Sequence, residues 1–130
     1  MGYGIKGLRM NLANHQIIDF YGCDKDVLSN SDIVKSYFVK AAELSQATIV
    51  SEKFHEFSPY GLTGVLVITE SHISIHTWPE HGYVAIDVFS CCDKLDHERL
   101  VNVLQRHFKA KKVNSKSIKR GKHGRTYIRK

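Results

Sequence analysis

The alternation of apolar and polar residues predicts a run of short strands through the middle of the chain. Segments rich in β-branched and aromatic residues occupy 48–57, 64–69, 72–78 and 83–91, and the loop SPYGLTG separates the first from the second. The gaps between the last three segments are too short for a crossover helix. These strands can therefore pair only as an antiparallel meander.

Two other segments repeat their apolar residues at helical spacing. One follows Asn30 or Ser31, either of which can cap a helix, and continues to about residue 47. The other has a stripe of Leu and Val after a possible Asp96 cap and ends near Phe108. A first strand is expected at 15–22, and the segment KKVNSKSI is a candidate for a last one.

The order of these elements, β-α-β-β-β-β-α-(β), predicts an α+β fold. It is a two-layer sandwich in which two helices pack on one face of an antiparallel sheet. A chain of 130 residues without an internal repeat fits a single domain, 1–130. Within this domain we expect a frayed N-terminus and a basic C-terminal extension, 109–130.

Side chains alternate between the two faces of a strand, which sorts the central residues into two sets. The apolar set belongs under the helices and comprises Ile73, Ile75, Thr77, Val84, Ile86 and Val88. The opposite face then carries polar and aromatic side chains, namely His72, Ser74, His76, Trp78, Asp87 and Cys91. The same alternation points Cys92 into the core, so Cys91 is the thiol available for chemistry.

The net charge of +6 comes from one end of the chain. Residues 109–130 carry ten Lys and Arg and no acidic residue, so 9 of the 19 basic residues remain against 13 acidic ones elsewhere. Such a tail suits a solvated terminus, or a contact with nucleic acid, an acidic surface or an acidic partner subunit. Three cysteines, two of them adjacent, do not suit a disulfide scaffold, and no apolar run reaches membrane-spanning length. We expect a soluble, cytoplasmic protein.

Several chemistries compete for the polar face, which could also be a merely hydrated surface. His72 and His76 supply only two imidazoles, with no CxxC or HExxH spacing, so no metal site is predicted. Residue types for a Ser-His-Asp hydrolase are present, but no G-x-S-x-G motif is. Glu70 and Ser71 instead form the predicted two-residue turn between two strands. Because neither is Gly or Asn, we expect this turn to be strained.

The segments ESHISIHTWPE and GYVAIDVFSC closely resemble the prokaryotic S-adenosylmethionine decarboxylase proenzymes. The similarity extends through FHEFSPYGLTG and more loosely to FYGCD, over roughly residues 15–92. It implies that Ser71 attacks the carbonyl of Glu70 and that the chain then splits, leaving a covalent pyruvoyl cofactor where Ser71 stood. A β chain, 1–70, and an α chain, 71–130, would result.

The resemblance also implies residue roles. His76 would accept the proton removed during processing, Cys91 would donate a proton in catalysis, and Thr63 would assist processing where relatives carry a serine. The substrate would be held by two aromatic side chains that stack on adenine and by a carboxylate that binds the ribose hydroxyls, namely Phe57, Trp78 and Glu80.

By the same resemblance, the pyruvoyl group would form a Schiff base with S-adenosylmethionine and accept electrons as CO2 leaves, which makes the aminopropyl donor for spermidine and other polyamines. A homodimer of αβ units, (αβ)2, is expected. One alternative is a pyruvoyl-dependent arginine or ornithine decarboxylase, against which the ribose-binding Glu80 argues. A more remote one is a non-enzymatic nucleic-acid-binding module that uses the basic tail.

Overall fold

The structure is a computed structural model that describes residues 3–91 and 93–129, with side chains for 11–91 and 93–121. Within these residues the strands form one six-stranded sheet in the order β2-β3-β4-β5-β1-β6, and every neighbouring pair is antiparallel. The elements are β1 (Tyr3–Tyr21), α1 (Lys25–Ser29), α2 (Ser31–Leu44), β2 (Ile49–Glu56), β3 (Leu62–Ile68), β4 (Ser71–Trp78), a 3-10 turn (Pro79–His81), β5 (Tyr83–Ser90), α3 (His97–Phe108) and β6 (Lys112–Arg129).

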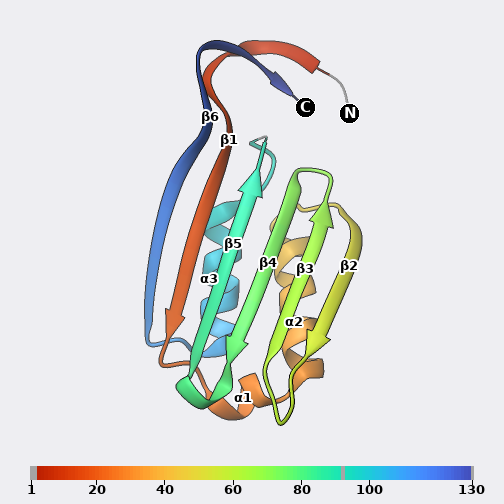
Figure 1. Ribbon diagram of the computed structural model, residues 1–130, viewed down its shortest axis with the longest axis vertical. Helices are drawn as coiled ribbons and strands as arrows, with labels where there is room; N and C mark the ends of the chain where they lie inside the picture. The colour runs from red at the N-terminus through yellow and green to blue at the C-terminus, as the bar shows by residue number, and fades with distance from the viewer. Residues whose placement is uncertain (1–2, 92, 130) are drawn as a thin grey trace.

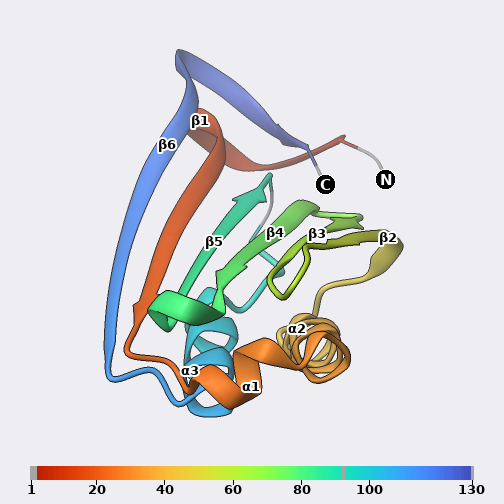
Figure 2. The same cartoon turned by 60° about the horizontal axis from the view of Figure 1, so that its bottom comes forward.

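The helices all lie on one face of the sheet, as the α+β prediction requires (Figure 1, Figure 2). Both predicted caps are present, because Asn30 accepts a hydrogen bond from the amide of Ile33 and Asp96 accepts one from the amide of Arg99. Helix α1 was not predicted, since five residues are too few to display a helical period. Among the described residues no helix is long and apolar enough to cross a membrane.

The core lies between the helices and the sheet. All six residues assigned to the helix side by alternation are buried, with exposed fractions of 5% or less. Phe20 of β1 meets Phe108 of α3 edge to face, and Phe38 of α2 meets Phe54 of β2 in the same manner. Burying each such side chain contributes about 1.5–3 kcal/mol, which explains why the helices remain on this face. The predicted two-layer core is confirmed.

The two ends of the chain differ from the prediction. Strand β1 begins at Tyr3, and its first part pairs only with β6, which continues to Arg129. These strand ends form a two-stranded arm that bends over the open side of the sheet (Figure 2). The expectation of a frayed N-terminus is therefore wrong, whereas the basic extension contains the strand for which KKVNSKSI was a candidate. Polar segments can form strands when their backbone groups pair with each other, and the sequence of such strands shows no alternation of apolar residues.

Much of the basic tail lies on β6, which is an edge strand. Lys116, Lys119 and Arg120 are exposed along it. Charged side chains on an edge strand prevent it from pairing with another sheet edge. This gives the basic residues a structural role that requires no nucleic acid.

Candidate active site

The β3–β4 junction contains the candidate cleavage bond. The turn consists of Thr69 and Glu70, one residue earlier than predicted, and Ser71 already pairs with Ile68 and with Ser90. Ser71 has a φ of 148°, in a region that non-glycine residues rarely adopt. Such a conformation costs of the order of 1–3 kcal/mol. The expected strain is present, and it is located at Ser71.

The carbonyl oxygen of Glu70 accepts two hydrogen bonds from one residue. The amide N–H of Cys91 donates to it at 3.0 Å, and the Cys91 Sγ lies 3.2 Å from it. Two donors at one carbonyl oxygen are the arrangement that stabilises negative charge when a nucleophile attacks the carbon. Alternation did not predict this position, because β5 ends at Ser90 and Cys91 is only 3% exposed. Cys91 is thus buried just beyond the strand whose alternation assigned it to the open face, and its thiol lies at the junction.

The side chain of Glu70 is also held, and it is only 3% exposed. Its carboxylate accepts hydrogen bonds from the Thr69 hydroxyl at 2.6 Å and from the Thr48 amide at 3.2 Å, and it pairs with the Lys94 Nζ at 3.2 Å. Burial acts to raise the pKa of this carboxyl, but the three donors outweigh it, so the pKa lies below its ordinary value. Glu70 is thus ionised and fixed at both its carbonyl and its carboxylate.

His76 lies away from this junction. Its Nδ1 is 3.1 Å from the hydroxyl of Thr63, directly across the β3–β4 ladder, so the predicted processing pair is in contact. His76 is five residues along β4 from Ser71. At about 3.3 Å per residue, the two Cα atoms of one chain are about 16 Å apart. The structure brings Thr63 and His76 together but does not bring them to Ser71 of the same chain.

The predicted substrate-binding side chains lie farther still from Ser71. Trp78 ends β4 and is 42% exposed, about 23 Å from Ser71 at the same rise per residue. Glu80 is exposed in the 3-10 turn, and Phe57 is exposed just after β2. A Cβ placed on Gly61 would lie 3.8 Å from both the Phe57 Cβ and the Pro79 Cδ, so these side chains share one end of the sheet.

The family model described as S-adenosylmethionine decarboxylase matches residues 14–121. This chain belongs to the S-adenosylmethionine decarboxylase family. It is 46% identical over 113 residues to an S-adenosylmethionine decarboxylase proenzyme of Acidithiobacillus ferrooxidans, covering 86% of this chain and 85% of the relative.

A proenzyme of the same name from Thermotoga maritima is 44% identical and covers 87% of each chain. The fold agrees as well. A crystal structure of the adenosylmethionine decarboxylase from Aquifex aeolicus superposes with a TM-score of 0.79 at 32% identity, covering 87% of this chain and 93% of that one. The family resemblance drawn from the motif is confirmed.

This member of the decarboxylase family carries a second polar cluster on the open face. The Asp87 carboxylate lies 2.6 Å from the His15 Nε2 and 3.2 Å from the His72 Nε2, and it accepts a hydrogen bond from Ser74. No sequence pattern pointed to His15, because β1 is far from β4 and β5 along the chain. Two imidazoles and a carboxylate can hold a metal ion, but Arg120 donates to the His15 Nδ1 and thereby leaves the proton on Nε2, facing Asp87. The contacts are those of a hydrogen-bond network.

An aromatic row adjoins the Trp78 end of the decarboxylase-family motif. Tyr83 lies 5.3 Å from Trp78 and stacks on Tyr21 at 5.3 Å between ring centroids. The Tyr83 hydroxyl donates to Asp19 at 2.5 Å. Burial, followed by this bond and the charge of Asp19, raises the pKa of Tyr83 to about 12. Tyr83 therefore remains a neutral ring beside Trp78.

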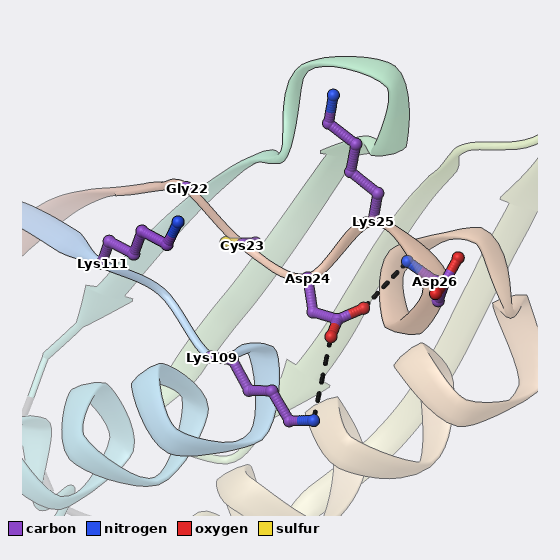
Figure 3. A pocket seen from close by; sticks show the side chains of 7 residues that line it. All are labelled: Gly22, Cys23, Asp24, Lys25, Asp26, Lys109 and Lys111. Carbon is purple, nitrogen blue, oxygen red and sulfur yellow. Dashed lines mark hydrogen bonds and ion pairs between the residues drawn. The ribbon is translucent and has the colours of Figure 1, made fainter.

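A hollow at the end of β1 has no such chemistry (Figure 3). Asp24 caps α1 and lies 3.8 Å from the Lys109 Nζ, so these two charges in the hollow are paired. Burial raises the pKa of Cys23 to about 11, which keeps this thiol protonated and unreactive. Cys92, which was predicted to enter the core, lies outside the described residues.

Proposed function

We propose that the protein is an S-adenosylmethionine decarboxylase that makes its own pyruvoyl group by cleaving itself between Glu70 and Ser71. Membership of a family whose relatives are named proenzymes supports this function. The observation that carries it is the cleavage junction, where a strained serine follows a carbonyl oxygen that accepts two hydrogen bonds from Cys91.

The first step is a shift of the acyl group from nitrogen to oxygen. The Ser71 hydroxyl attacks the Glu70 carbonyl carbon, the C–N bond breaks, and the hydroxyl proton passes to the departing nitrogen, which leaves an ester. Negative charge develops on the oxygen that already faces the Cys91 amide and thiol, where the two donors stabilise it. Opening the peptide bond also releases the strain at Ser71.

The second step is an elimination. A base removes the Ser71 α-proton, the bond between Cβ and oxygen breaks, and Glu70 leaves as the carboxylate that ends the β chain. Water then replaces the nitrogen at the new N-terminus of the α chain, ammonia departs and the pyruvoyl group remains. A neutral imidazole suits this proton transfer, and we assign it to His76, oriented by the hydroxyl of Thr63.

The distance of about 16 Å along β4 requires that this base come from a second copy of the chain. We propose an (αβ)2 homodimer in which the open sheet faces meet about a two-fold axis, so that each His76 serves the Ser71 of the other copy. The open face has the exposed apolar side chains that such an interface buries, including Ile17, Tyr21 and Trp78.

The same cross-chain arrangement accounts for the separation of Trp78 from Ser71. We propose that Phe57 and Trp78 of one copy stack on the adenine of S-adenosylmethionine, contributing about 1–3 kcal/mol, and that Glu80 accepts from the ribose hydroxyls. The pyruvoyl carbonyl would supply the electron sink for decarboxylation. Cys91, at the junction of the other copy, would deliver a proton to the substrate Cα.

Two measurements test this function. Denaturing gels of the purified protein should show two fragments, and mass spectrometry should locate the cut between Glu70 and Ser71 with pyruvate at the start of the α chain. Labelled CO2 should be released from S-adenosylmethionine and not from arginine or ornithine. Ser71→Ala is the uncleaved control. A folded wild-type chain that stays whole, or one that acts only on the free amino acids, would contradict the proposal.

A further inference from the structure

We infer that Lys94 and Thr48 are positioning residues for self-cleavage, because they hold the Glu70 side chain and so fix the carbonyl that Ser71 attacks. This inference rests on the proposed function. It adds to that function two residues that lie outside the family motif around the cleavage bond and that do not touch the reacting atoms.

Two contacts from one short segment hold Glu70. Cys91 donates to the Glu70 carbonyl, and Lys94, three residues later, pairs with the Glu70 carboxylate at 3.2 Å. Thr48 supports both partners, because its amide donates to the Glu70 carboxylate at 3.2 Å and its hydroxyl accepts from the Lys94 Nζ at 2.9 Å. The Thr69 amide also donates to the Thr48 carbonyl, which ties the turn to the start of β2. The residue on the acyl side of the cleaved bond is thus fixed at both ends.

The Glu70 carboxylate needs the cationic Lys94 because it is buried. The Glu70 side chain is 3% exposed, and a buried carboxylate that loses its charge partner is costly unless it moves toward water. Lys94 is itself 50% exposed, so its removal should alter global stability little. The expected response is a local shift of Glu70. Because a displacement of about 1 Å from attack geometry can cost up to about 100-fold in rate, cleavage should be far more sensitive than folding.

The experiment compares single substitutions in the full-length chain. Newly translated protein is followed on denaturing gels to measure the rate of cleavage. Lys94→Met should slow cleavage about 10-fold or more, whereas Lys94→Arg, which keeps the charge and the donors, should remain within about 3-fold of wild type. Lys35→Met is the matched control, since it removes the exposed Lys35–Glu56 pair of 2.8 Å far from the junction. Its rate should equal that of wild type.

Hydroxylamine identifies the step that is slowed, because it cuts esters and leaves amides. Uncleaved Lys94→Met should resist it, since the attack on a misplaced carbonyl is the slow step. His76→Ala, which lacks the base for the second step, should accumulate the ester and be cut. Thr48→Val removes the Lys94 acceptor but keeps the backbone donor, and it should slow cleavage less than Lys94→Met does.

The outcomes are separable. A folded wild-type chain that does not cleave contradicts the proposed function itself. If wild type cleaves and both Lys94→Met and Thr48→Val cleave as fast as wild type, the inference is wrong and the proposed function stands. Two other results also overturn the inference. One is a Lys94→Arg variant that cleaves as slowly as Lys94→Met, and the other is uncleaved Lys94→Met protein that hydroxylamine cuts. Circular-dichroism melting verifies that each variant is folded.

Discussion

A mixed dimer can test whether Ser71 is served by the His76 of its own chain or of its partner. Proton transfer requires contact at about 2.6–3.2 Å between heavy atoms, whereas the two Cα atoms within one chain are about 16 Å apart along a regular strand. Even with the side chains extended toward each other, the gap remains several ångströms. A chain that carries His76→Ala should therefore be rescued by a partner that carries Ser71→Ala.

The assay co-expresses the two variants with tags of different size. Neither should be cleaved alone. When equal amounts pair at random, about half of the His76→Ala chains have a partner with an intact histidine, so about half of them should be cut. Purification through both tags isolates the mixed dimer, in which essentially all of the His76→Ala chains should be cut and no Ser71→Ala chain should be.

The refuting result is an isolated mixed dimer that stays uncut while wild type cleaves normally. Pairing wild-type chains with an inactive partner gives the converse control. The wild type is co-expressed with an equal amount of a Ser71→Ala, His76→Ala double variant. Only about half of the wild-type chains should then be cleaved, because the other half pair with a chain that lacks the histidine. Complete cleavage of the wild-type chains would mean that His76 acts within its own chain.

Three further predictions concern Cys91, Thr63 and Glu70. Cys91→Ala should still cleave, because its backbone amide remains on the Glu70 carbonyl, but release of labelled CO2 should fall about 100-fold or more with the proton donor gone. Thr63→Val should slow cleavage by about 3- to 10-fold through loss of one hydrogen bond to His76, and Thr63→Ser should not, as gels will measure. In a Ser71→Ala background, the stabilisation from ionised Glu70 should be present above its ordinary pKa of 4.5 and lost as the pH falls through the lowered pKa. Urea unfolding against pH measures this loss, and Glu70→Gln is the control that lacks it and keeps only the pH dependence of the other groups.

Much of the fold was readable because its core alternates strictly. Ile73, Ile75 and their neighbours on β5 are buried in an unbroken period of two, and Asn30 and Asp96 mark the two longer helices. The arm formed by the ends of β1 and β6 was not readable. Its strands are stabilised by pairing with each other, and pairing between distant polar segments leaves no local pattern.

The sequence predicted the identity of the site residues better than it predicted their positions. The motif identified Glu70, Ser71 and His76, but only the register of β4 reveals that His76 is too far from Ser71 to act on it. Alternation could not predict the contacts of Cys91, because the strand ends one residue earlier. Lys94 was missed because a lysine after a strand resembles any surface residue until the buried Glu70 carboxylate is found beside it.

The strand order has a consequence for the protein after it is cut. The break at Glu70 would assign β1, β2 and β3 to one polypeptide and β4, β5 and β6 to the other, yet in the sheet β1 lies between β5 and β6. The two products are therefore interleaved. To part, they must break the β3–β4, β5–β1 and β1–β6 ladders together. Self-cleavage would convert a single-chain protein into a heterodimer whose two chains share one sheet. This heterodimer should survive dilution that would dissociate two fragments joined at a single sheet edge.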